Sequence, residues 1–236
     1  FHMELPVIVY TGNVEELHKI RDTRVLLEIG GAATYTEAFD ALAAFDPSME
    51  DLLKRFSSLH IRNAGTVGGN IANGSPIGDG PPPLIALGAK VVLRSKSGAR
   101  MVELEDFFIA YKKQDRKPGE FVEKLVIPKR PDNVLFRVYK LSKRFDQDIS
   151  AVCGAFALTI EDDEIVAARI AFGGMAGTPH RAHKAERALV GRVWNDEAVE
   201  KAMAALDDDY EPMTDARASA EYRRTTARNL LKRFYI

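Results

Sequence analysis

The segment 62–89, RNAGTVGGNIANGSPIGDGPPPLIALGA, constrains the fold of this chain more than any other stretch, because no ordinary core element needs such a mixture of residues. Its glycines free the backbone for positive φ angles and for close approach to a ligand. Hydrogen-bonding side chains lie between them, those of Asn63, Thr66, Asn70, Asn73, Ser75 and Asp79. Apolar anchors such as Ile71 and Leu84 distinguish the segment from a disordered linker. We expect a ligand-binding loop, with a turn-rich connector as the alternative.

The common glycine-rich nucleotide motifs do not match this segment. A dinucleotide fingerprint requires G-x-G-x-x-G, and a Walker loop requires G-x-x-x-x-G-K-[ST]. The arrangement GTVGGN at 65–70 satisfies neither pattern. A Rossmann or P-loop assignment is therefore unsupported.

Composition excludes several classes of protein. The 236 residues suffice for one large domain or two modest ones. Because 33 Lys and Arg residues balance 34 Asp and Glu residues, the net charge of -1 gives no electrostatic reason to bind nucleic acid or an anionic membrane. No apolar run reaches the roughly 18 residues of a membrane-spanning helix. Cys153 is the only cysteine, so we expect no disulfide, no four-cysteine iron–sulfur cluster in this chain, and a reducing, cytoplasmic location.

The first half of the chain mixes strand and helix signals. Aliphatic runs predict strands at 5–10, 24–30 and 121–127, and a hairpin of 90–95 with 100–104. Four helices are also predicted. Helical composition predicts one at 14–21, and a capping box that starts at Thr34 predicts one from 34 to about 46. Prolines suited to a first helical turn, at 47 and at 81–83, precede the other two, from 49 to about 58 and at 84–87. The charged, proline-bearing stretch 129–133 is the predicted domain boundary.

The second half predicts an antiparallel sheet covered by helices, an α+β arrangement. Strand-like runs at 134–141, 151–160 and 165–172 are joined by short polar links, which favours a meander. Helices are expected at 181–190, 195–206 and 218–236, with Asn195 and Ser219 as caps of the last two. Small residues alternate with larger apolar ones along 151–160, so Cys153 is expected to be a buried filler.

Several single residues have more than one interpretation on composition alone. Phe56, just before the glycine-rich segment, is a core aromatic or a partner for a flat ring. Lys140 lies in the apolar run FRVYKL, where an outward-facing residue with a solvated amine is the simplest interpretation. His180, His183 and Glu186 fall at helical spacing but match no recognised zinc pattern. We therefore predict neither a metal site nor a catalytic residue.

Three motifs together resemble a known family. They are the segment 62–89, YKLSKRFDQDISAV at 139–152 and AFGGMAGTPHRA at 171–182. Their order and spacing are similar to those in the FAD-binding portion of xanthine dehydrogenase and related molybdenum hydroxylases, above all the bacterial small subunit. The resemblance implies the second lobe of a PCMH-type flavin-binding domain over residues 1–128. A C-terminal domain, 129–236, is implied to carry a three-stranded antiparallel sheet packed by helices.

The resemblance also implies a set of cofactor-binding residues. They are Phe56, Thr66, Val67, Gly68, Gly69, Asn70, Asp79, Val122 and Lys140. Lys140 is implied to lie near the flavin, where its charge favours the negatively charged reduced form. In the family a glycine-rich pyrophosphate loop, G-G-x-T-D, precedes these motifs, and this chain does not contain it. The implied unit is an N-terminally truncated FAD-binding domain, and full, weak and absent FAD binding all stay open for it.

The implied activity is electron transfer within a larger oxidoreductase. Electrons from hypoxanthine or xanthine pass from a molybdopterin centre through iron–sulfur clusters to FAD and then to NAD. The implied partners are an iron–sulfur domain of the same subunit and a molybdopterin-binding large subunit, so the isolated fragment is expected to be inactive. Two alternatives stay open: the flavoprotein subunit of carbon monoxide dehydrogenase or another molybdenum hydroxylase, and a cofactor-free module that docks subunits.

Overall fold

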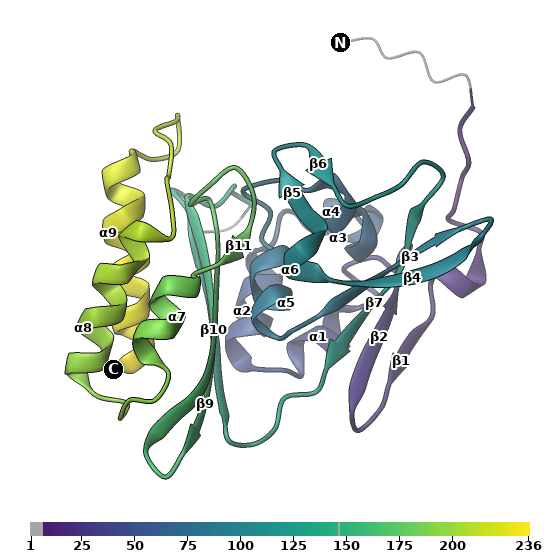
Figure 1. The fold of residues 1–236 in the computed structure, drawn as a ribbon. Coiled ribbons are helices and arrows are strands. Elements are labelled where there is room, and N and C mark those ends of the chain that lie inside the picture. The colour runs from purple at the N-terminus through teal and green to yellow at the C-terminus, as the bar shows by residue number, and fades with distance from the viewer. Residues whose placement is uncertain (1–6, 146) are drawn as a thin grey trace.

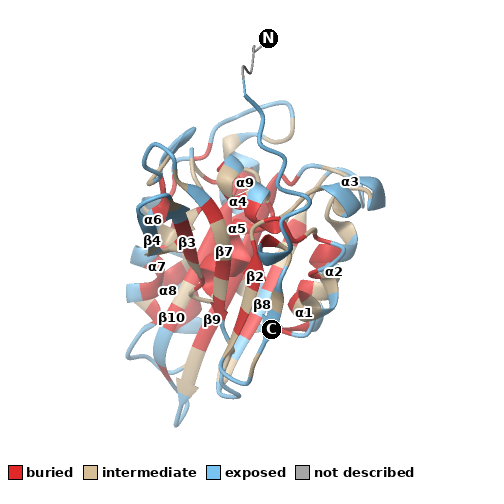
Figure 2. Ribbon diagram, turned by 90° about the vertical axis from the view of Figure 1, so that its right-hand side faces the viewer, coloured by how far each residue is buried: buried red, intermediate tan, exposed pale blue. Residues whose placement is uncertain are grey.

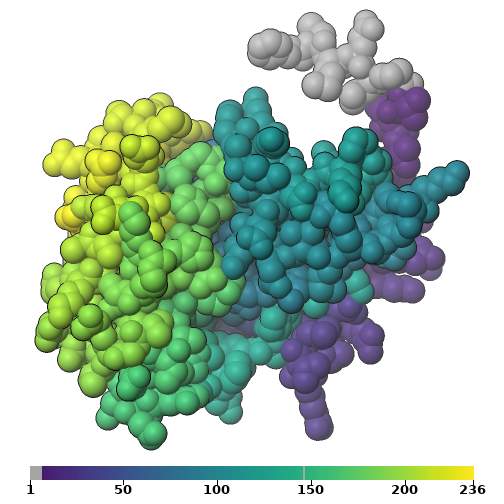
Figure 3. Space-filling view, in the orientation of Figure 1, coloured from purple at the N-terminus to yellow at the C-terminus, as the bar shows by residue number. Residues whose placement is uncertain are grey.

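The computed structural model describes residues 7–145 and 147–236. Within them an outer group of helices, a four-stranded sheet, an inner group of helices and a five-stranded sheet follow one another across the molecule (Figure 1). The purple residues early in the chain and the yellow C-terminal helix lie on opposite sides in the space-filling view (Figure 3). The N-terminal half of the chain therefore forms the side with the five-stranded sheet, and the C-terminal residues form the outer helices.

The five-stranded sheet has the order β1-β2-β7-β3-β4, and neighbouring strands are antiparallel. Its strands are β1 (Ile20–Asp22), β2 (Leu26–Gly30), β7 (Phe121–Pro128), β3 (Lys90–Ser95) and β4 (Gly98–Glu103). The strands predicted at 24–30 and 121–127 and the hairpin of 90–95 with 100–104 are therefore confirmed. A short helix α6 (Leu104–Phe107) and the small hairpin of β5 (Phe108–Ala110) and β6 (Lys113–Gln114) follow β4.

The inner helices share one hydrophobic core with both large sheets. They are α1 (Phe39–Ala43), α2 (Pro47–Arg55), α3 (Leu59–Ala64), α4 (Val67–Asn73) and α5 (Pro81–Ala86), after a 3-10 turn η1 (Glu15–Leu17). Ile29 and Leu125 of the five-stranded sheet belong to the same buried cluster as Ile85 of α5 and Phe136 of the four-stranded sheet. Figure 2 shows this centre in red, enclosed by exposed turns. The helices that contain the glycine-rich segment therefore join the two sheets.

The four-stranded sheet has the order β11-β10-β9-β8 and is antiparallel throughout. Its strands are β8 (Val134–Leu141), β9 (Val152–Glu161), β10 (Glu164–Gly173) and β11 (His180–Arg181). The three predicted strands are confirmed, and the two-residue β11 adds a short fourth one. The outer helices are α7 (His183–Leu189), α8 (Asp196–Ala205) and α9 (Ala220–Tyr235), with a 3-10 turn η2 (Leu206–Asp208). Asn195 and Ser219 cap α8 and α9 as predicted.

Strand β9 separates two cores. Its small residues, Cys153 and Ala155 among them, face the inner helices, whereas Phe156 and Leu158 belong to the cluster under the outer helices. Cys153 is 1% exposed, and burial raises the pKa of its thiol well above the usual value. The prediction of a buried filler is confirmed. In the described ranges no helix combines the length and the apolar character that crossing a membrane requires.

Two predictions near the start of the chain are wrong. Of the strand predicted at 5–10, residues 5 and 6 lie outside the described residues, and residues 7–10 are exposed and belong to no strand. The helix predicted at 14–21 is replaced by η1 and β1. Thr23 donates from both N and Oγ1 to Leu26 O, at 3.0 and 2.8 Å, and closes the turn that pairs β1 with β2. Strand pairing therefore outweighs the weak helix propensity of this short segment.

Candidate functional site

The glycine-rich segment 62–89 folds mainly into short helices, so the predicted loop form is wrong. Thr66 Oγ1 accepts a hydrogen bond from Gly69 N at 2.9 Å and caps α4. Gly74, with a φ of 58°, ends this helix in the left-handed conformation. Residues 75–80 form an irregular turn before Pro81 opens α5. Closely spaced caps and breakers therefore fit short helices into a segment whose composition indicated a loop.

One end of α4 packs backbone against backbone on the five-stranded sheet. A Cβ at Gly68 would lie 2.5 Å from Gly31 O, so only glycine fits there. Gly31 in turn approaches Val122 O too closely to carry a Cβ of its own. This contact places the predicted site residues 66–69 near the predicted site residue Val122.

A cleft of about 250 Å³ lies toward the other end of α4. Its walls include Phe56 after α2, Asn70 and Asn73 of α4, and Asp79 in the turn before α5. Residues 147–149, in the loop between β8 and β9, also line the cleft. An aromatic ring, amide groups and a carboxylate around one opening suit a flat ligand with a polar edge.

The carboxylate of Asp79 belongs to a closed, buried polar network. Lys140 Nζ donates to Asp79 Oδ2 at 2.5 Å and to Ser150 Oγ at 2.8 Å, and Ser150 Oγ donates to Asp79 Oδ1 at 2.5 Å. The Lys140 side chain is 0% exposed, and that of Asp79 is 8% exposed. Burying two charges is tolerated only where each is paired and hydrogen-bonded, as here. The outward-facing interpretation of Lys140 is wrong, because Lys140 shares its face of β8 with the buried Phe136 and Val138.

Phe56 lies at the border between the core and the cleft. It is half-buried, and its ring stacks on Tyr35 with centroids 4.2 Å apart and planes at 29°. Phe56 also lines the cleft. The two interpretations of this aromatic residue are therefore compatible, since one part of the ring packs inward and another is available to a ligand.

Arg55 holds the loop between β8 and β9 against α2. Its Nε donates to Phe145 O at 2.8 Å, and its Nη1 donates to Lys140 O at 3.0 Å. Within the loop, Arg144 N donates to Asp148 Oδ2 at 2.8 Å, and this bond is the first cause of a lowered pKa at Asp148. The rim of the cleft therefore carries a carboxylate that is charged at neutral pH.

The third motif supports the turn that carries Asp79. Gly174 N donates to Pro76 O at 2.7 Å, and Gly173 packs against Pro82. The buried Arg223 of α9 donates to the carbonyl oxygens of Gly174 and Ala151. The three motifs, which are far apart in the sequence, therefore converge on the turn that carries Asp79.

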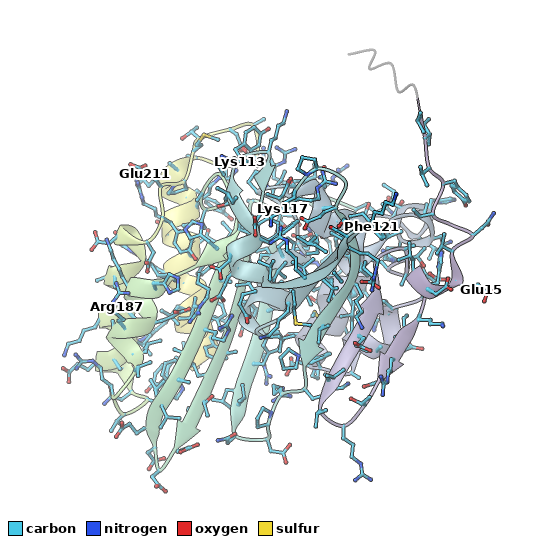
Figure 4. All side chains as sticks on the ribbon, turned by 45° about the vertical axis from the view of Figure 1, so that its right-hand side comes forward. Glu15, Lys113, Lys117, Phe121, Arg187 and Glu211 are labelled. Atoms are coloured by element: carbon cyan, nitrogen blue, oxygen red, sulfur yellow. The ribbon has the colours of Figure 1, made fainter. Side chains whose placement is uncertain are left out.

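The predicted site residues fall into two groups joined by α4. Phe56, Asn70 and Asp79 line the cleft, and Lys140 lies directly behind Asp79. Residues 66–69 and Val122 lie at the other end of the helix. The sequence predicts neither Ser150 nor Tyr35, although Ser150 falls within the motif 139–152. The six side chains that Figure 4 labels, Glu15, Lys113, Lys117, Phe121, Arg187 and Glu211, lie outside the cleft lining.

Two of the residues considered as metal ligands, His180 and Glu186, have other partners, and His183 Nδ1 lies 3.4 Å from Glu186 Oε2. His180 is within hydrogen-bonding distance of Thr178 O and Asp209 O, at 3.1 and 3.3 Å. Glu186 accepts hydrogen bonds from Ile170 N and from Arg181. In the described part of the chain no three His, Cys, Asp or Glu residues gather in a group that could hold a metal ion.

Two family profiles match consecutive parts of the chain. Residues 1–130 match the family described as FAD binding domain in molybdopterin dehydrogenase. Residues 137–236 match the family described as CO dehydrogenase flavoprotein C-terminal domain. Both matches concern the flavoprotein component of enzymes with a molybdenum centre.

Individual proteins are similar over nearly the whole chain. Nicotinate hydroxylase hnxS of Emericella nidulans is 32% identical over 97% of this chain, which spans 19% of that protein. Xanthine dehydrogenase/oxidase of Gallus gallus is 30% identical over 100% of this chain, which spans 18% of it. A solved structure, reconstituted CO dehydrogenase from Oligotropha carboxidovorans, superimposes with a TM-score of 0.84 at 32% identity. That superposition covers 92% of this chain and 77% of the other.

Proposed function

The chain belongs to the FAD-binding flavoprotein family of the molybdenum hydroxylases, and from this premise we propose that its cleft receives the flavin ring of FAD in an electron-transferring oxidoreductase. The observation that carries the proposal is the meeting of Phe56, Asn70 and Asp79 at one opening, with Lys140 paired to Asp79 behind it. These groups come from separate elements. Family membership supplies the identity of the ligand.

The chemistry of the cleft fits a flavin ring. Phe56 offers an aromatic surface for a flat conjugated system, and Asn70 and Asp79 offer an amide and a carboxylate for a polar edge. The volume of about 250 Å³ lies below the roughly 300–1,000 Å³ of pockets that enclose a complete drug-sized ligand. The cleft is therefore too small to enclose the whole of FAD, and we propose that the flavin ring enters it while the remainder of FAD lies outside. We propose that residues 66–69 and Val122 contact FAD outside the cleft.

Bound FAD would supply reversible electron transfer, and the chain would supply position and electrostatics. Asp79 lines the cleft, whereas Lys140 lies behind it. We therefore propose that Asp79 contacts the flavin and that Lys140, by hydrogen bonding to Asp79 Oδ2, orients this carboxylate. Ser150 completes the arrangement by holding the second carboxylate oxygen.

Two finer forms of the function are proposed. Similarity to a xanthine dehydrogenase over the whole chain supports oxidation of hypoxanthine or xanthine, with NAD as the final acceptor. The family of residues 137–236 and the superimposed structure support a carbon monoxide dehydrogenase or another molybdenum hydroxylase. In both forms the proposed partners are an iron–sulfur domain and a molybdopterin-binding large subunit. We also propose the domain boundary at residues 128 and 129 and a cytoplasmic location, the latter on the single cysteine.

Titration of the purified chain with FAD tests the proposal. We expect saturable binding with one FAD per chain, quenched flavin fluorescence and a flavin signal in visible circular dichroism. Asp79→Asn should weaken binding, whereas Asp132→Asn, at an exposed position in the link between β7 and β8, should not. Absence of saturable binding would reject the proposal for this chain and favour the cofactor-free docking module.

A further inference from the structure

Tyr35 lies beneath the cleft and touches two of the residues that line it. It is 2% exposed. Its ring stacks on Phe56, and its hydroxyl donates to Asn70 Oδ1 at 3.0 Å. A single buried side chain therefore connects the aromatic wall of the cleft to its amide wall.

The surroundings leave the Tyr35–Asn70 pair little freedom. Tyr35 N donates to Gly65 O at 3.0 Å, which ties its backbone to the residue before the cap of α4. On the other side, a Cβ at Gly80 would overlap Asn70 Oδ1 and would lie 2.5 Å from the Tyr35 hydroxyl oxygen. Glycine at position 80 therefore lets the backbone close over the hydrogen bond.

This hydrogen bond determines what Asn70 presents to a ligand. An amide has an acceptor oxygen and a donor nitrogen. Because the oxygen accepts from Tyr35, the Nδ2 amino group is left for the cleft that Asn70 lines. Burial first, and the charge of Asp79 second, raise the pKa of Tyr35, so its hydroxyl stays protonated at every physiological pH.

Resting on the proposed function, we infer that Tyr35 is a positioning residue that fixes Asn70 as a hydrogen-bond donor to the cleft. The cleft then selects a flat ring whose polar edge offers an acceptor atom, a carbonyl oxygen or an unprotonated ring nitrogen, toward Asn70. Asp79 supplies an acceptor in the same cleft for an N–H group of that edge. Tyr35 itself contacts no ligand in this arrangement and acts through Asn70.

A double-mutant cycle with FAD as the probe tests this inference. Tyr35→Phe keeps the stacked ring and removes only the hydroxyl, so the FAD Kd should rise roughly two- to tenfold, as for the loss of one net hydrogen bond. Asn70→Ala should weaken binding at least as much, and adding Tyr35→Phe to it should have no further effect. Asn70→Asp, which replaces the donor by an acceptor, should bind FAD more weakly than Asn70→Ala. Tyr111→Phe, at an exposed tyrosine, is the matched control.

Three outcomes would overturn the inference while leaving the proposed function intact. The first is wild-type FAD affinity in Tyr35→Phe, and the second is wild-type FAD affinity in Asn70→Asp. The third is a loss of FAD affinity on adding Tyr35→Phe to Asn70→Ala that equals the loss caused by Tyr35→Phe in the wild type. A measurement without ligand tests the Tyr35–Asn70 hydrogen bond even if the chain does not bind FAD. In nuclear magnetic resonance spectra the Asn70 side-chain amide signals should shift in Tyr35→Phe and stay in place in Tyr111→Phe. Unchanged signals in Tyr35→Phe would reject the inference even if the proposed function has also failed.

Discussion

The buried Asp79–Lys140 pair gives the most quantitative prediction. Lys140→Met removes a cation whose side chain is 0% exposed and leaves Ser150 as the described hydrogen-bond partner of an Asp79 carboxylate that is 8% exposed. Removing one partner of a buried pair costs roughly 3–5 kcal/mol of unfolding free energy, because the other charge stays buried without compensation. At about 2–4 °C per kcal/mol for a domain of this size, Tm should fall by roughly 6–20 °C.

Urea unfolding followed by far-ultraviolet circular dichroism measures this loss. Lys96→Met, at an exposed position in the β3–β4 turn, is the control and should stay within about 0.5 kcal/mol of the wild type. Asp79→Leu combined with Lys140→Met removes both charges and should recover much of the stability. A loss below about 1 kcal/mol in Lys140→Met, the value of an exposed ion pair, would refute the account of this network.

Three further predictions concern the packing of α4, the loop beside the cleft, and pH. Gly68→Ala should destabilise the fold by about 1–3 kcal/mol, since its Cβ would lie 2.5 Å from Gly31 O, whereas Gly177→Ala, with its nearest neighbour at 3.9 Å, should be neutral in the same unfolding assay. Arg55→Gln removes two hydrogen bonds, so tryptic cleavage after Lys143 or Arg144 should become roughly five- to thirtyfold faster. Lys54→Gln is the control, and a cleavage rate in Arg55→Gln equal to that of the control would contradict the role of Arg55. Two hydrogen bonds, the larger contribution from Arg100 and the smaller from Lys117 N, lower the pKa of Glu120 from 4.5 to about 2. The ionised Glu120 carboxylate therefore stabilises the fold above pH 4.5, and this stabilisation is lost as the pH falls to 2. The Tm difference between the wild type and Glu120→Gln should shrink between pH 4.5 and pH 2. A Tm difference that stays constant over this range would contradict a stabilising Arg100–Glu120 pair.

Much of the fold is predictable because local signals and tertiary packing agree. The alternation along 134–141 and 165–172 predicts strands, and the same residues bury one face or both in the sheet. Pro47 follows the capping residue Asp46 at the start of α2, as its fixed φ favours. In these elements the local pattern of residue types and the tertiary packing favour the same structure.

The failures occur where distant contacts decide. The capping-box bonds between Thr34 and Glu37 form, yet the following helix α1 spans only Phe39–Ala43. Segment 14–21 yields a strand because β2 is available to pair with it. In β8 a period of two, counted from Phe136 and Val138, places Lys140 on the buried face, although composition alone favoured an outward-facing residue. Burial of the amine depends on the distant carboxylate of Asp79, which pairs with it.

The candidate site was predictable only in part. Its segments follow from the resemblance of three motifs, and the structure brings Phe56, Asn70 and Asp79 to one cleft. Tyr35 carries no motif of its own, and its importance depends on contacts with residues 21 and 35 positions further along the chain. Such a residue becomes visible only when the fold places it beneath the cleft.

Competition between FAD and lumiflavin tests the central claim most directly. Lumiflavin has the flavin ring without the ribityl and phosphate groups of FAD, and the flavin ring is the part of FAD that we propose enters the cleft of about 250 Å³. The account predicts that lumiflavin displaces FAD competitively from the chain and that Asp79→Asn weakens both ligands, whereas Asp132→Asn weakens neither. FAD binding that persists unchanged in excess lumiflavin and in Asp79→Asn would contradict the assignment of the flavin ring to this cleft.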